Sequence, residues 1–133
     1  MMTIAVVITG IVLAFIYLGT PAHQRLVSLD EKRVRDLETI ASSLNARYQS
    51  TPLPSRLPGD LVILDDGHNQ SYEFHRLDAT HYTLCTVFAT SYSLENGAYS
   101  VEGVEGAERW RHGVGRTCYK FDVTQTPLMP QRI

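Results

Sequence analysis

An uninterrupted apolar run at the N-terminus limits what this chain can fold into more than any other feature. Residues 2–18 read MTIAVVITGIVLAFIYL and contain no charged residue. Because a helix rises about 1.5 Å per residue and a bilayer core is about 30 Å thick, a run of this length is typical of a membrane-spanning helix. A helix that is apolar on every side also exceeds what the rest of so short a chain can bury. We therefore expect residues 1–20 to form a transmembrane anchor.

A cleaved signal peptide is the main alternative for this segment. Signal peptides carry a basic region, a shorter apolar run and a small-residue cleavage site. No Lys or Arg precedes the apolar run, and only Thr20-Pro21-Ala22 offers a passable cleavage site. We therefore expect the anchor to be retained, in contact with the lipid bilayer and with other membrane protein subunits. Small residues of the anchor allow close contact between helices: Ala5, Thr9 and Gly10, with Ala14 further on.

Two signals disagree on the side of the membrane that the remaining chain occupies. Cations follow the anchor at positions 25, 32, 33 and 35, which favours a cytoplasmic location under the positive-inside rule. Against this, Cys85 and Cys118 lie in strand-like segments and form a disulfide candidate, which needs an oxidising compartment. Two buried thiols are the alternative for this pair. Because small exported domains depend on disulfides more than cytosolic ones, we expect an extracytoplasmic, periplasmic location.

The chain beyond the anchor is long enough for one domain of about 110 residues. The net charge is −2, and nucleic-acid-binding domains carry a clustered basic surface, so we expect no nucleic-acid partner. We divide the chain into the anchor over 1–20, an amphipathic helix over 21–50, a proline-rich loop over 51–70, a small antiparallel β domain over 71–126 with a long loop over 90–115, and a tail over 127–133.

An apolar stripe predicts the amphipathic helix. Its members recur at three- and four-residue steps: Val34, Leu37, Ala41, Leu44 and Tyr48. Ser28-Leu29-Asp30-Glu31 matches a capping box, which would supply acceptors for the free amides of a first turn. The alternative is one helix that continues from the anchor through Pro21, with a kink there. Two heptads are too few for a coiled coil, so we expect the stripe to pack on a sheet of the same chain.

Three segments carry a β signal. Residues 71–77 alternate aromatic and polar side chains, residues 82–89 are β-branched and aromatic, and together they predict an antiparallel hairpin. Residues 117–123 alternate again and predict a third strand. A third strand beside the second brings Cys85 opposite Cys118, within disulfide distance. The fold class that follows is α+β, with an N-terminal transmembrane helix that continues into an amphipathic helix on a sheet of about three strands.

The order of these elements resembles a known family. Asp65-Asp66-Gly67-His68-Asn69-Gln70-Ser71-Tyr72-Glu73-Phe74 is similar to the Asp-x-x-Gly-x-x-Tyr-x-Tyr stretch of bacterial type IV pilin-like proteins, and of the major pseudopilins of type II secretion among them. The resemblance implies a helix laid across the sheet. Those proteins carry a basic leader and, shortly after it, a Glu that aligns subunits in the filament. No acidic residue precedes Asp30 here, so we expect the scaffold without the filament function.

Candidate chemistry is sparse. His75, His81 and His112 lack the close spacing of zinc ligands, so we expect surface histidines, no metal, no cofactor and no catalytic residue. The remaining polar cluster is a candidate partner-binding surface, because Arg and Trp are frequent in binding hot spots: Arg109, Trp110, Arg111, His112 and Arg116. The alternative for Trp110 is packing in the core.

These observations favour a non-enzymatic, single-pass membrane protein. A short anchor and a small domain without catalytic groups are typical of an accessory or structural subunit of a larger membrane complex, of which respiratory and photosynthetic complexes are examples. The first alternative is a pseudopilin-like component of a secretion or surface-filament system. The second is a small membrane-anchored enzyme or metal-binding domain.

Overall fold

The computed structural model describes residues 2–18, 20–92, 107–126 and 128–133. Its fold is α+β, as the sequence predicts, with a long N-terminal apolar helix and antiparallel sheets. In chain order the elements are α1 (Met2–Leu18), α2 (Pro21–Tyr48), the 3-10 helix η1 (Gly59–Leu61), β1 (Leu64–Asp65), β2 (Gln70–Ser71), β3 (Glu73–Arg76), β4 (His81–Phe88), the 3-10 helix η3 (Ala107–Trp110), β5 (Gly115–Asp122) and β6 (Gln131–Arg132).

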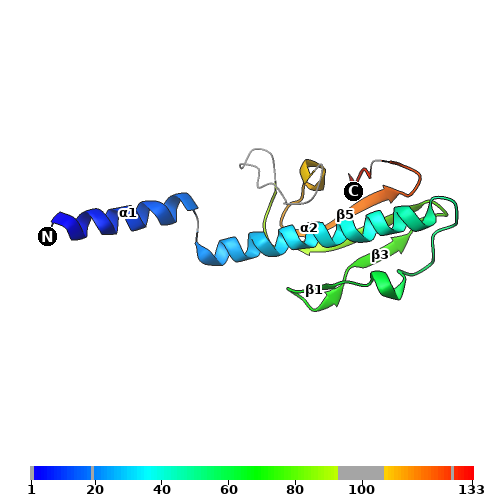
Figure 1. The fold of residues 1–133 in the computed structure, drawn as a ribbon, viewed down its shortest axis with the longest axis horizontal. Coiled ribbons are helices and arrows are strands. Elements are labelled where there is room, and N and C mark those ends of the chain that lie inside the picture. The colour runs from blue at the N-terminus through cyan, green and yellow to red at the C-terminus, as the bar shows by residue number, and fades with distance from the viewer. Residues whose placement is uncertain (1, 19, 93–106, 127) are drawn as a thin grey trace.

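Two helices account for the N-terminal part of the chain. α1 projects away from the rest of the protein along its long axis, and α2 runs in the same general direction across the sheet (Figure 1). α2 begins at Pro21, where Thr20 is the N-cap and its side chain accepts a hydrogen bond from the amide of His23. The expected capping box at Ser28 is therefore wrong, because Ser28 lies well inside α2. A capping Thr followed by Pro in the first turn is the stronger helix start.

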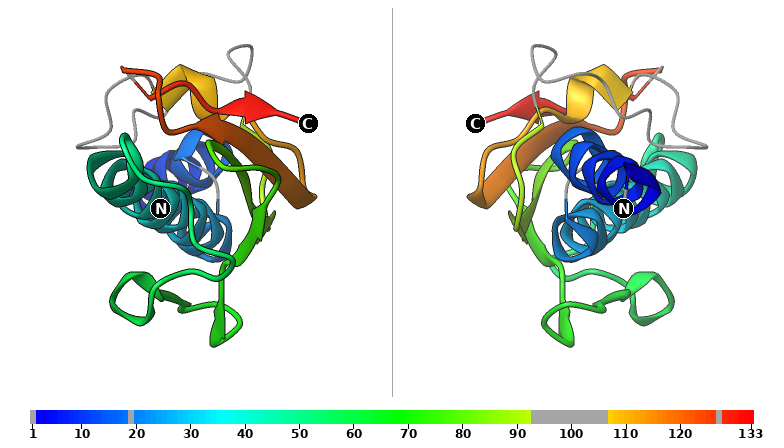
Figure 2. Two further views of the ribbon diagram at one scale, coloured as in Figure 1. Left: turned by 90° about the vertical axis from the view of Figure 1, so that its right-hand side faces the viewer. Right: turned by 90° about the vertical axis from the view of Figure 1, so that its left-hand side faces the viewer.

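The core lies between α2 and the larger sheet. Seen along the long axis, α2 lies against one face of that sheet (Figure 2). The apolar stripe of α2 is buried there, at Val34, Leu37, Ile40, Ala41 and Leu44. The opposing side chains are mostly aromatic, because every second residue of β4 and β5 points toward the helix: Tyr82, Leu84, Phe88, Tyr119 and Phe121.

The larger sheet has four strands in the order β3-β4-β5-β6, all antiparallel. The prediction of about three strands is thus one too few for this sheet. β6 belongs to the expected tail, and its end is held by a hydrogen bond from the amide of Ile133 to the carbonyl of Cys118. A separate two-stranded hairpin, β1 with β2, forms in the segment expected to be a proline-rich loop.

Part of the expected long loop over 90–115 has defined structure. Tyr92 and His112 form an isolated antiparallel bridge, with a 2.8 Å hydrogen bond from the amide of Tyr92 to the carbonyl of His112. η3 ends at Trp110, two residues before His112, and β5 begins at Gly115, the last residue of the expected loop. The middle of the expected loop, residues 93–106, lies outside the described residues. The two ends of the segment are therefore drawn together next to β4 and β5.

Candidate functional site

The surface of α1 is the first candidate site. The apolar stretch of this helix is 0% buried, and its length and composition are sufficient to cross a membrane. Ala5 and Thr9 lie one turn apart, and the hydroxyl of Thr9 donates to the carbonyl of Ala5 at 2.8 Å. Gly10 and Ala14 form a second pair, about 100° around the axis from the first. A methyl group added at Gly10 would meet nothing within 4 Å. All four residues are exposed, so both pairs are available for contact with another helix.

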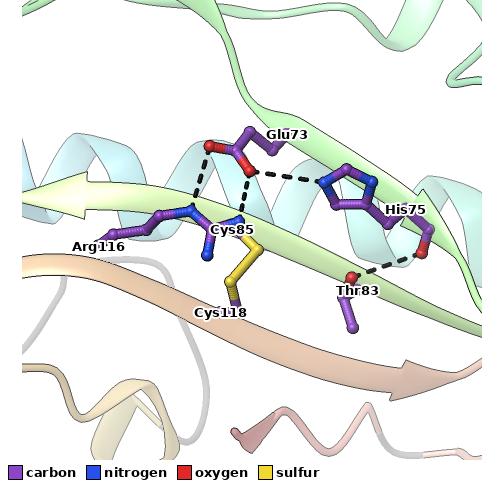
Figure 3. Close-up of a disulfide and its surroundings, with 6 residues drawn as sticks. All are labelled: Glu73, His75, Thr83, Cys85, Arg116 and Cys118. Atoms are coloured by element: carbon purple, nitrogen blue, oxygen red, sulfur yellow. Dashed lines mark hydrogen bonds and ion pairs between the residues drawn. A yellow bond between two sulfur atoms is a disulfide. The ribbon is translucent and has the colours of Figure 1, made fainter.

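The outer face of the sheet carries the predicted disulfide. Cys85 and Cys118 are directly opposite each other on β4 and β5, with their Cα atoms 4.1 Å apart, and their sulfur atoms are bonded. Glu73 pairs with Cys85 on β3, and Arg116 is two residues from Cys118 on β5, so both side chains lie on this face (Figure 3). Sulfur atoms that are bonded to each other supply no thiolate nucleophile.

An ion pair lies beside this disulfide. Arg116 donates to both carboxylate oxygens of Glu73, at 2.6 and 3.3 Å. The Nε2 atom of His75 lies 3.5 Å from the same carboxylate (Figure 3). The hydrogen bond from Arg116 holds the pKa of Glu73 below its usual range. The charges of this face are therefore largely satisfied within it.

The structure divides the predicted partner-binding cluster into three locations. Trp110 and His112 are interior residues, with 1% and 2% of their surface exposed. Arg116 lies on the disulfide face and pairs with Glu73. Only Arg109 and Arg111 are exposed and close together, at the end of the domain formed by η3 and β6.

Trp110 and His112 both contribute to the core. The ring of Trp110 packs edge-on against Tyr119, with centroids 5.0 Å apart, as the alternative interpretation from the sequence required. The ring of His112 stacks on Phe88 with centroids 3.6 Å apart. Its Nδ1 atom lies 3.0 Å from the carbonyl oxygen of Thr90. Burial lowers the pKa of His112, so the imidazole is neutral at physiological pH.

Arg109 and Arg111 line an open depression of about 510 Å³ together with Pro130 and Arg132. We call this depression the arginine cleft. Arg132 comes from β6, the strand that the sequence did not reveal, so sequence reasoning missed one of its three cations. Of the described residues that line the cleft, three are cations and none is acidic.

A buried ionic network is the second feature that the sequence did not reveal. Arg33 donates from Nη1 to Asp30 at 2.7 Å and from Nε to Asp65 at 2.9 Å. Asp30 also accepts hydrogen bonds from the amides of Ala89 and Thr90 and from the hydroxyl of Thr90. Burial disfavours the charge of Asp65, but the hydrogen bonds from Arg33 and His68 outweigh it and lower the pKa. The network thus joins α2 to the β1–β2 hairpin and to the end of β4.

A second set of contacts holds the same hairpin on α2. Lys32 lies 3.0 Å from Asp36 and 3.3 Å from Asp66. The hydroxyl of Tyr72 donates to Asp36 at 2.8 Å. Side chains between Asp65 and Tyr72 therefore hold the β1–β2 hairpin against α2. A sequence signal for the buried network did exist, since Asp30 and Arg33 fall on the same helical face as the apolar stripe.

The described residues offer little for enzymatic or metal chemistry. Within them, no group of three or more His, Cys, Asp or Glu side chains could hold a metal ion. His75 contacts Glu73, and His81 contacts Asp78 at 2.9 Å. The small cavity beside the hairpin, lined by Asp65, His68 and Cys85 among others, measures about 110 Å³. Small-molecule sites are commonly about 300 Å³ or larger.

Comparison with protein-family models, with curated proteins and with solved structures gave no match.

Proposed function

We propose that this chain is a non-enzymatic, single-pass membrane protein that acts as an accessory or structural subunit of a larger membrane complex, with respiratory and photosynthetic complexes among the candidates. The observation that carries the proposal is α1, a helix whose apolar stretch is 0% buried in the described fold. An exposed apolar surface of this extent is stable only when lipid or another protein covers it.

The disulfide supports an extracytoplasmic location for the domain. Disulfides persist in oxidising compartments and are rare in the cytosol. The cations that follow the anchor favour a cytoplasmic location instead. Of these, Arg33 has a role in the fold itself, since it is buried between Asp30 and Asp65. Arg33 is therefore needed in the fold whichever side of the membrane the domain occupies, and it counts less as a signal for a cytoplasmic location.

Two measurements test the anchor and the subunit role. Alkaline carbonate extraction should leave the full chain in the membrane pellet, and release into the supernatant would contradict a spanning helix. Purification in mild detergent should then recover a stoichiometric partner. A chain that migrates alone under these conditions would contradict the subunit role.

A matched pair of variants tests contact through α1. Gly10→Leu fills one of the exposed small-residue pairs, so we expect the partner to be lost while the chain stays in the membrane. Ile11→Leu preserves volume on the side of α1 that carries neither pair, and should leave the complex intact. Equal recovery of the partner with both variants would contradict contact through Gly10 and Ala14.

A pseudopilin-like component of a secretion or filament system is the second candidate. The support for it is the layout of one long helix across an antiparallel sheet, with the Asp65-to-Tyr72 hairpin fastened to that helix. Treatment with a prepilin peptidase distinguishes the two. Under the first proposal the N-terminus stays unchanged, whereas processing near it would favour the pseudopilin role.

A further inference from the structure

The arginine cleft is distinguished by the convergence of cations on one depression. Four cations elsewhere in the domain have a carboxylate partner, in the pairs Lys32–Asp36, Arg33–Asp30, Arg47–Asp60 and Arg116–Glu73. Among the described residues, Arg109 and Arg132 form no ion pair, although both line the same depression. Nη1 of Arg109 donates to the carbonyl of Leu128 at 3.4 Å, which orients the side chain. The charge of Arg109 also acts on the carboxyl group of Glu38, with which it forms no ion pair.

Guanidinium groups that line one open depression repel each other, and a bound anion relieves this repulsion. The guanidinium group is planar and binds carboxylates and phosphates through paired hydrogen bonds. The positive potential of the cleft also reaches the interior, since the charge of Arg132 contributes to the lowered pKa of His112. The cleft is therefore suited to an anionic ligand rather than to an apolar or cationic one.

The position of the cleft argues against lipid headgroups as that ligand. The charge of Arg109 acts on Glu38 of α2, so the cleft lies close to this residue. Glu38 is about 25 Å along the helix from Pro21, at 1.5 Å per residue. α1 and α2 extend in the same general direction (Figure 1). At physiological ionic strength charges are screened over about 8 Å, so the membrane that holds α1 is too distant.

The open shape favours an extended acidic chain over a small anion. The cleft is formed at the edge of the sheet by Pro130 and Arg132, opposite Arg109 and Arg111. A ligand held there is contacted from one side only, so several weak charge pairs along a chain bind better than one isolated anion.

We infer that the arginine cleft docks an acidic polypeptide segment of a partner protein. The inference rests on the proposed function, because the partner is another subunit of the complex and α1 sets the distance from the membrane. Side-chain carboxylates of the segment pair with Arg109 and Arg132, and Arg111 borders the same site. The domain then contributes its own contact to the assembly, separate from that of the anchor.

The test uses the full chain inserted in nanodiscs of zwitterionic lipid, with a synthetic oligoglutamate peptide as the probe. The cleft variant is Arg109→Gln with Arg132→Gln. The matched control is Arg25→Gln with Arg56→Gln, since these two arginines are also exposed and form no ion pair among the described residues. Circular dichroism and the mass of the disulfide-bonded chain establish that each variant folds.

We expect the peptide to bind the wild-type chain, and to bind more weakly as salt is added. The cleft variant should weaken binding by about tenfold or more, since two charge-assisted contacts are lost. The control variant should bind like the wild type. Absent binding to the wild type, or equal losses in the two variants, would overturn the inference.

A second arm distinguishes the source of the anion. Phosphatidylglycerol vesicles are added in place of the peptide, with phosphatidylcholine vesicles as the control. Binding of the acidic vesicles through Arg109 and Arg132, without binding of the peptide, would replace the acidic segment by a lipid surface and overturn the inference. Failure to insert into nanodiscs contradicts the proposed function instead, so the two failures are distinct.

Discussion

Asp30 and Arg33 form an ion pair of 2.7 Å within α2, and only 0% and 3% of the two side chains are exposed. Buried charges of this kind are tolerated only when every polar group around them is satisfied. Asp30 meets this condition through the amides of Ala89 and Thr90. The pair therefore fixes the position of the end of β4 on the helix.

Removal of one member of this pair should be strongly destabilising. In Asp30→Asn, Arg33 loses a charged partner, and the amides of Ala89 and Thr90 lose a carboxylate acceptor. We expect the free energy of unfolding to fall by about 3–5 kcal/mol, measured by urea denaturation. Asp60→Asn breaks the exposed pair with Arg47 and should change stability far less. Similar losses for both variants would contradict a structural role for the buried pair.

Gly67 is required by the same network. A methyl group at this position would collide with the guanidinium group of Arg33, which its bonds to Asp30 and Asp65 prevent from moving away. We expect Gly67→Ala to lower the free energy of unfolding by about 1–3 kcal/mol. Gly113→Ala is the control, since a methyl group there meets nothing within 4 Å. A tolerated Gly67→Ala would show that the guanidinium group is free to shift.

The buried His112 predicts a dependence of stability on pH. Its pKa in the folded protein lies below the usual value of 6.5, so the unfolded chain binds more protons in this range. The free energy of unfolding should therefore fall as the pH decreases from about 7 to about 5. The slope should be smaller in His112→Gln. Denaturation curves at the two pH values measure this slope; an unchanged slope in His112→Gln would exclude this residue as the origin.

The disulfide should stabilise the domain by restricting the unfolded chain. Cys85 and Cys118 are separated by 33 positions, for which the entropic contribution is about 3–4 kcal/mol. The double variant Cys85→Ser with Cys118→Ser should lose about this amount of stability. Addition of a reductant should bring the wild type to the level of the variant and leave the variant unchanged. Alkylation of two free thiols in protein taken from native membranes would instead contradict the bond.

The elements with strong periodicity were predictable, and the short ones were not. The stripe through Leu37 and Leu44 and the alternation around Cys85 and Cys118 each extend over seven or more residues, so the helix and the central strands follow from local pattern. β6 contains only two residues, follows Pro130 and has no alternation of its own. β6 forms because β5 offers backbone groups with which it can pair. The sequence of the tail alone therefore does not predict this strand.

The candidate site was predictable only in part, for a related reason. Trp110 and Arg109 are adjacent in the sequence, yet one is a core residue and the other is exposed, because η3 turns them to opposite sides. A cluster of residues along the chain is therefore a poor guide to a cluster in space. The third cation of the cleft, Arg132, is brought close to Arg109 by the sheet.

No residue of α1 whose burial the structure describes is buried in the domain. Under the proposed membrane role, this separates the free energy of inserting α1 into a bilayer from the free energy of folding the domain. Insertion of α1 into a bilayer and folding of the domain share no side-chain packing in the apolar core. A substitution in one is thus invisible to the stability of the other. Under the proposed membrane role, α1 is free to change over evolution at the rate that its neighbours in the membrane permit, and an unrelated apolar helix could replace it while the domain keeps its fold.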